Sequence, residues 1–166
     1  MFQNQVYINP AQAVPGDFAS TNPMVFKLSG AGKCVADSSG VTVGRFAVLN
    51  TTGTVTSIPG AAPTPIQRLG FVNRGNNAQI TTFLAESGNT IQPGQPVSLF
   101  GTGDFFVNAD AITGSPTRGA TIAWDFTTGL INVGGAIAGN LIDTGYKLVS
   151  ESAAVGQTVI ISNTGA

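Results

Sequence analysis

Glycine and proline interrupt this chain so often that a long helix has no room to form. The 166 residues include 22 glycines and nine prolines, the two residue types that most weaken a helix interior. Between these breaks lie short runs rich in Val, Ile, Thr and Phe, which is the composition typical of β-strands. We expect about a dozen short strands, at residues 24–28, 33–36, 41–49, 54–58, 69–72, 79–84, 96–100, 105–107, 121–124, 130–133, 146–150 and 158–162.

Turn-forming residues separate these strands at close spacing. Ser39-Gly40 and Thr127-Thr128-Gly129 are typical breaks, because glycine accepts positive φ and Ser and Thr cap their own backbone. Many short strands with frequent turns predict an all-β fold, either a jelly-roll-like sandwich or a small Greek-key barrel. The length suits one domain, which we place at residues 24–166.

The first 23 residues differ from the rest. They are rich in Gln, Asn, Ala and Pro, and Asn9-Pro10 and Asn22-Pro23 break any regular element. We expect an extended N-terminal arm at residues 1–23, separable from the β domain, that docks on a neighbouring subunit; a frayed terminus is the alternative. Its apolar side chains are spaced too irregularly for an amphipathic helix. These side chains are the arm's candidate partner contacts: Phe2, Val6, Tyr7, Ile8 and Phe18.

Charge is scarce along the whole chain. Asp, Glu, Lys and Arg make up 9% of the residues, against roughly 25% in an ordinary soluble domain. Such a neutral surface favours association, so we expect a homo-trimer or homo-dimer, although Thr, Asn, Gln and Ser could hydrate it instead. The seven basic residues are dispersed, which argues against nucleic acid. Neither a signal peptide nor a run of about 20 apolar residues is present, so we expect no membrane contact.

The residues that carry most enzyme chemistry are missing. The chain has no histidine, which removes the commonest general base and every imidazole metal ligand. Cys34 is the single cysteine and has no second thiol to pair with. Gly32-Lys33-Cys34 mimics part of a phosphate loop, but Cys34 stands where Ser or Thr must reach magnesium. We expect no catalytic activity, no cofactor, no metal and no small-molecule substrate.

Aromatic residues are the remaining candidates for recognition. Phe105 and Phe106 are adjacent, and neighbouring residues of a strand point to opposite faces. One of the two therefore faces away from the core, unless a second layer covers both faces. We take Phe105, Phe106 and Trp124 as candidate partner contacts, and an exposed aromatic platform for sugar is the alternative.

Several segments, in the same order, resemble the structural cement proteins of tailed bacteriophages. They are Ala13 to Pro23, Gly40 to Ala47, Gly70-Phe71-Val72-Asn73-Arg74, Ala78 to Glu86, Ile91 to Phe100 and Gly103-Asp104-Phe105-Phe106-Val107. The resemblance covers residues 13–107 and weakens beyond Asp110.

This resemblance implies a jelly-roll-like subunit with no activity and no cofactor. Such a subunit is made in the cytoplasm of the host bacterium and binds the outer capsid surface of the virion. There it bridges neighbouring copies of the major capsid protein. The alternative function is a carbohydrate-binding β-sandwich of a tail fibre or adhesin.

Overall fold

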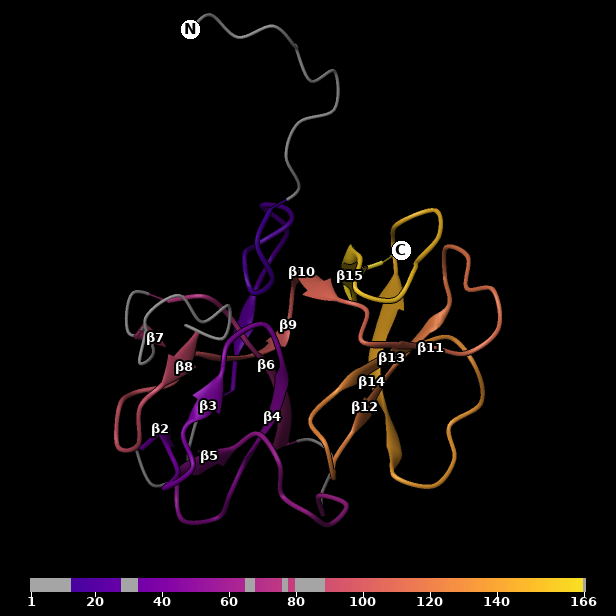
Figure 1. Cartoon of the computed structure of the whole chain (residues 1–166). Helices are drawn as coiled ribbons and strands as arrows, with labels where there is room; N and C mark the ends of the chain where they lie inside the picture. The colour runs from indigo at the N-terminus through magenta and orange to yellow at the C-terminus, as the bar shows by residue number, and fades with distance from the viewer. Residues whose placement is uncertain (1–12, 28–32, 65–67, 76–77, 80–88, 166) are drawn as a thin grey trace, which may run out of the picture.

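The computed structural model describes residues 13–27, 33–64, 68–75, 78–79 and 89–165. These residues form fifteen strands in three sheets, and none of them lies in an α-helix. The all-β class and its sandwich-like layers are therefore confirmed. In Figure 1 the indigo-to-magenta part of the chain builds one half of the molecule, and the orange-to-yellow part builds the other.

The central sheet joins strands from the first two thirds of the chain. In spatial order it consists of β1 (Val25–Phe26), β9 (Leu99–Thr102), β6 (Leu69–Val72), β4 (Phe46–Leu49), β5 (Thr54–Thr56) and β2 (Val35–Ala36). A small third sheet consists of β3 (Val41–Thr42), β8 (Thr90–Ile91) and β7 (Ala78–Gln79).

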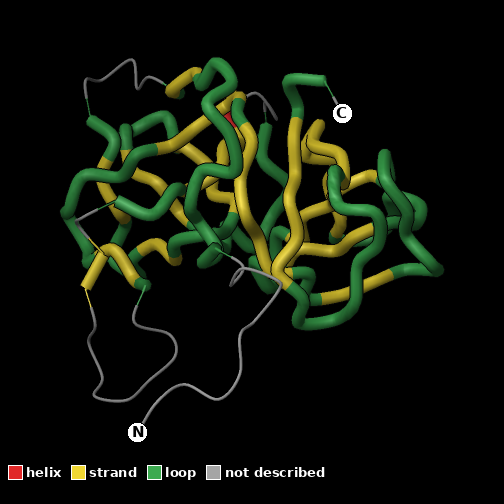
Figure 2. Tube along the Cα trace, turned by 90° about the horizontal axis from the view of Figure 1, so that it is seen from above, coloured by secondary structure: helices red, strands yellow, loops and turns green. Residues whose placement is uncertain are grey.

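The second sheet comes from the rest of the chain and lies beside the central sheet, as the view from above shows (Figure 2). Its spatial order is β10 (Asp104–Asn108), β15 (Thr158–Ser162), β14 (Leu141–Leu148), β12 (Thr121–Asp125), β13 (Ile131–Val133) and β11 (Ala111–Ile112).

Both faces of β4, an interior strand of the central sheet, are buried, which explains its continuous apolar run. Side chains alternate between the two faces of a strand. In β4, Phe46 and Val48 join the core shared with the second sheet, whereas Ala47 and Leu49 join a core shared with β3 and β8. All four residues of β4 are therefore buried.

The chain passes from the central to the second sheet through a corner at Gly103. Gly103 separates β9 from β10 and has φ of +147°. A Cβ atom at this position would lie 2.8 Å from Cζ of Phe105, closer than side chains pack. Glycine therefore lets one continuous segment serve both sheets, as strands at sandwich corners do.

The described part of the N-terminal segment runs antiparallel to this bent segment. The amides of Gly16 and Ala19 donate to the carbonyls of Phe106 and Asp104, at 2.8 and 2.9 Å. Further along, β1 pairs with β9. Residues 16–19 thus contact the β domain directly, while residues 1–12 lie outside the described residues. The division of the chain at residue 23 stays a prediction.

Some strand boundaries differ from the expected ones. The predicted strand 41–49 is split into β3 and β4, because Gly44 turns the chain with φ of +75° between them. Strands β8 and β11 were not expected, and β14 begins at Leu141 rather than residue 146. Of the predicted strand 79–84, residues 80–84 lie outside the described residues.

Candidate partner interface

A chain of aromatic contacts leads from the core to the surface. The Phe71 ring stacks on Phe105 with centroids 4.3 Å apart, and Phe105 contacts Phe100 at 5.6 Å. Phe100 in turn contacts Phe26 at 4.3 Å and Phe18 at 5.3 Å. Phe71 and Phe105 are fully buried, whereas Phe18 and Phe26 are exposed. The core therefore opens to the surface at this edge.

We call the exposed residues at this opening the apolar rim: Phe18, Met24, Val25 and Phe26. Their exposed fractions are 39%, 41%, 56% and 56%. Met24 lies over the corner, since its Cγ is 3.4 Å from the position a Cβ of Gly103 would take. The apolar rim follows β1, the last described strand on this side of the central sheet.

Asp104 fixes the loop that carries the apolar rim. The carboxylate is buried and accepts hydrogen bonds from Ser20 Oγ and Asn22 Nδ2, each at 2.5 Å. Its other oxygen accepts from Thr164 Oγ1 at 2.8 Å. Burial raises the pKa of Asp104, but hydrogen bonds from Ser162, Ser20, Thr164 and Asn22 outweigh that effect and hold this pKa below its usual value. The carboxylate therefore stays charged and ties Ser20, Asn22 and Thr164 to the corner.

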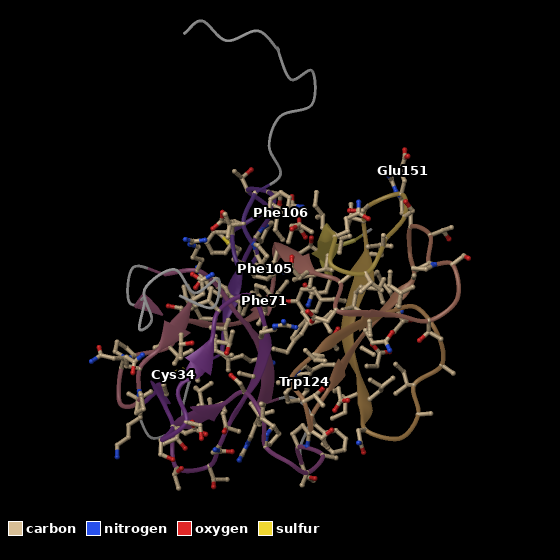
Figure 3. All side chains as sticks on the ribbon, viewed as in Figure 1. Cys34, Phe71, Phe105, Phe106, Trp124 and Glu151 are labelled. Atoms are coloured by element: carbon tan, nitrogen blue, oxygen red, sulfur yellow. The ribbon has the colours of Figure 1, made fainter. Side chains whose placement is uncertain are left out.

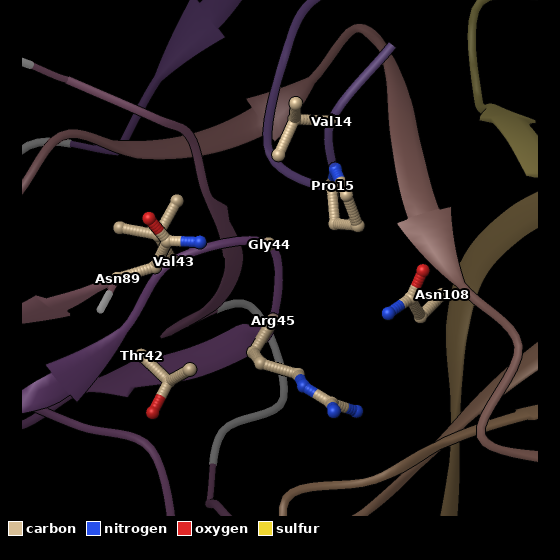
Figure 4. A pocket seen from close by; sticks show the side chains of 8 residues that line it. All are labelled: Val14, Pro15, Thr42, Val43, Gly44, Arg45, Asn89 and Asn108. Atoms are coloured by element: carbon tan, nitrogen blue, oxygen red, sulfur yellow. The ribbon is translucent and has the colours of Figure 1, made fainter. Parts of the chain in front are cut away.

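A cleft of about 360 Å³ is lined by residues 14–15 of the N-terminal segment and by residues 42–45, among others (Figure 4). Arg45 forms an ion pair with Asp110, which also accepts a 2.8 Å hydrogen bond from the amide of Ile131. Burial lowers the pKa of the Arg45 guanidinium. The pair joins the central sheet to the second sheet. The lining residues are Val14, Pro15, Thr42, Val43, Gly44, Arg45, Asn89 and Asn108.

The chemistry of this cleft is that of a structural joint. It has no nucleophile beside a base, and its guanidinium already has a carboxylate partner. Over the described ranges, no three His, Cys, Asp or Glu residues gather closely enough to hold a metal ion. Cys34 is half-buried, and burial raises the pKa of its thiol, which keeps it protonated.

The predicted contact residues fall into different environments (Figure 3). Phe105 and Trp124 are fully buried. Phe106 is half-buried on the opposite face of β10, where it pairs with the half-buried Ile160 of β15. Phe18 belongs to the apolar rim. The remaining four, Phe2, Val6, Tyr7 and Ile8, lie outside the described residues, and partner contact by all eight stays a prediction.

Three residues of the apolar rim were missed as candidates. Met24, Val25 and Phe26 lie within the predicted strand 24–28. Because neighbouring side chains of a strand alternate in direction, three consecutive large apolar residues include at least one that faces outward, unless layers cover both faces as they do in β4. The sequence therefore shows an apolar run at these residues, but not that their strand ends the sheet.

Trp124 offers no surface to a sugar. Its exposed fraction is 0%, and it lies in the core between the central and second sheets. Sugar platforms need an accessible aromatic face, so the burial of Trp124 weakens the carbohydrate-binding alternative. In the part of the chain that the structure describes, no helix is long and apolar enough to span a membrane.

The fold and its surface define a structural β-protein with an exposed apolar edge. The chain belongs to the XM1 gp53 minor capsid protein family, whose model matches residues 2–163. A chain in the solved capsid of Myoviridae phage XM1 has the same fold, with a TM-score of 0.63 and 13% sequence identity. The match covers 99% of this chain and 98% of that one. No curated protein matches.

Family membership confirms the resemblance to capsid-associated proteins of tailed phages. The protein therefore has a structural role in a phage capsid and is a component of the virion.

Proposed function

We propose that this protein is a capsid cement, or decoration, protein. It binds the outer surface of a tailed-phage head and bridges neighbouring copies of the major capsid protein. The observation that carries the proposal is the apolar rim, in a chain that belongs to a capsid protein family. Its four exposed apolar side chains lie at an edge held in place by the hydrogen bonds to Asp104 and by the pairing of β1 with β9. A rigid apolar edge loses little entropy when a partner covers it.

The energy required of each copy is small. Contact area contributes about 25 cal/mol per Å² before the costs of ordering are subtracted. A shell carries many copies of its proteins, and linked contacts strengthen one another through avidity. A modest rim on each copy is therefore sufficient to stabilise a shell.

Besides the apolar rim, which includes Phe18, the contacts with the capsid come from Phe106 and from the N-terminal residues Phe2, Val6, Tyr7 and Ile8. Phe105 supports this surface from inside the core, where it is fully buried and contacts Phe18, whereas Trp124 is fully buried among the core residues. A homo-trimer or homo-dimer of the protein also fits its low charge. Catalysis forms no part of this proposal.

Co-sedimentation tests the proposal. Purified protein is mixed with capsids that lack it, and the shells are pelleted and analysed for bound protein. The proposal expects saturable binding and shells that withstand heating or chelation better than undecorated ones. Protein that stays in the supernatant at every concentration would refute it.

A further inference from the structure

The apolar rim borders an open sheet edge. Residues 16–19 hydrogen-bond along β10, but among the described strands none pairs with the outer side of β1. Both residues of β1 are 56% exposed. An edge strand presents unpaired N–H and C=O groups, which form a template for another strand.

The area of the apolar rim restricts what can occupy it. An aromatic side chain has about 150–250 Å² of surface and Met and Val have no more, so at their exposed fractions the four residues present at most roughly 400 Å². A stable interface between folded proteins buries about 800 Å² on each partner. The apolar rim is therefore too small to hold two folded domains together by itself, and its size suits a single extended segment.

Charge restricts the occupant further. Charged residues flank the apolar rim, but none belongs to it: Asp17 precedes Phe18, Lys27 follows Phe26 with its alkyl chain against Gly101, and Asp104 is buried with its hydrogen bonds satisfied. A charged group laid on the four apolar side chains of the rim would lose hydration, and none of these side chains offers it an opposite charge. The surface therefore selects an uncharged apolar segment.

We infer that the apolar rim receives an extended, uncharged segment of a capsid shell subunit, which adds as a strand beside β1. Backbone hydrogen bonds to the sheet edge supply part of the affinity in this mode of recognition. Apolar side chains of the segment pack on Phe18, Met24 and Phe26, which Phe100 and the Gly103 corner hold in place. This inference rests on the proposed function and names the partner's chemistry.

The test compares two substitutions of the same kind. Val25→Lys places a charge on the open edge, which is how natural edge strands block strand addition. Val155→Lys makes the same change at a residue that is 70% exposed and lies away from the apolar rim. The amide of the next residue, Gly156, donates to the carbonyl of Ala109, which follows the end of β10. Both side chains are exposed, so both variants should melt like the wild type. Val25→Thr, which is uncharged and β-branched, is the control for a change at the same position without a charge.

We expect Val25→Lys to weaken co-sedimentation with undecorated capsids by about tenfold or more, while Val155→Lys and Val25→Thr bind like the wild type. Equal binding of wild type and Val25→Lys would overturn the inference and leave the proposed function intact. Failure of the wild type to bind would overturn both. If Val25→Lys instead lowered the mass in light scattering and left shell binding unchanged, the occupant would be a second copy, which also overturns the inference.

Discussion

The carboxylate of Asp104 accepts a 2.5 Å hydrogen bond from the side-chain amide of Asn22, 82 residues away in the sequence. Ser20 and Thr164 donate to the same carboxylate. One buried charge thus holds the N-terminal segment, the corner between the sheets and the C-terminal residues together. The position of the apolar rim depends on this contact, because residues 20–24 lead directly into β1.

Replacing Asp104 with Asn should destabilise the fold. The amide keeps one acceptor oxygen but presents an NH₂ group to donors, and hydrogen bonds to a buried charge contribute about 1.5–3 kcal/mol each. We expect Asp104→Asn to lower the free energy of unfolding by about 2–3 kcal/mol in urea titrations. Asp143→Asn is the control, because Asp143 is exposed and accepts from its local turn. Equal effects of the two substitutions would contradict this role.

The free energy of unfolding should depend on pH through the same carboxylate. The folded-state pKa of Asp104 lies below its usual value, so its contribution is fully present above about pH 4 and is lost as pH falls through the folded pKa. The stability difference between wild type and Asp104→Asn should therefore shrink below about pH 4. Urea titrations at neutral and acid pH check this, and a difference that grows in acid would show that the sign is wrong.

Truncation should separate two parts of the N-terminal segment. The sequence led us to expect that residues 1–23 are separable. The described contacts of residues 13–23, however, include Phe18 on Phe100 and Phe105 and two of the donors to Asp104, Ser20 and Asn22. Removing residues 1–23 should lower Tm by roughly 5 °C or more. Removing residues 1–12, which deletes none of these contacts, is the control. If the protein lacking residues 1–23 melted at the same Tm as the full-length protein, residues 13–23 would add nothing to the stability of the fold.

Gly103→Ala tests the corner between the sheets. The alanine would have to keep φ of +147°, and its Cβ would lie 2.8 Å from Cζ of the Phe105 ring. Gly139→Ala is a matched control, because Gly139 also has positive φ but nothing within 4 Å of its Cβ position. The control should lose only about 1 kcal/mol from backbone strain, and Gly103→Ala should lose about 2 kcal/mol more. Similar losses in chemical denaturation would mean that the corner has room for a side chain.

The sequence predicted those features of the fold that local pattern decides. The alternation in residues 158–162 appears as β15, and the dense turns appear as an all-β sandwich. The predicted strand began only at residue 146, directly after Gly145, a residue type typical of turns. In the structure β14 runs through Gly145, at the point where its pairing register with β12 shifts. A glycine inside a bulged strand looks like a turn until its partner strand is known.

The interface could be predicted only in part, because exposure depends on long-range pairing. Phe105 and Trp124 were chosen as aromatic candidates, and the packing of the two sheets buries both. Met24, Val25 and Phe26 are exposed because β1, paired with β9, is the last strand at that edge. A sequence pattern does not reveal which strand ends a sheet, so the apolar rim emerged only from the three-dimensional arrangement.

Electron cryo-microscopy of shells with and without added protein tests the central claim most directly. We expect added density of this β-sandwich on the outer face of the capsid, spanning the boundary between neighbouring coat subunits, with the β1 edge turned toward the shell. Density confined to the inner face, or density that contacts a single coat subunit without reaching its neighbour, would contradict it.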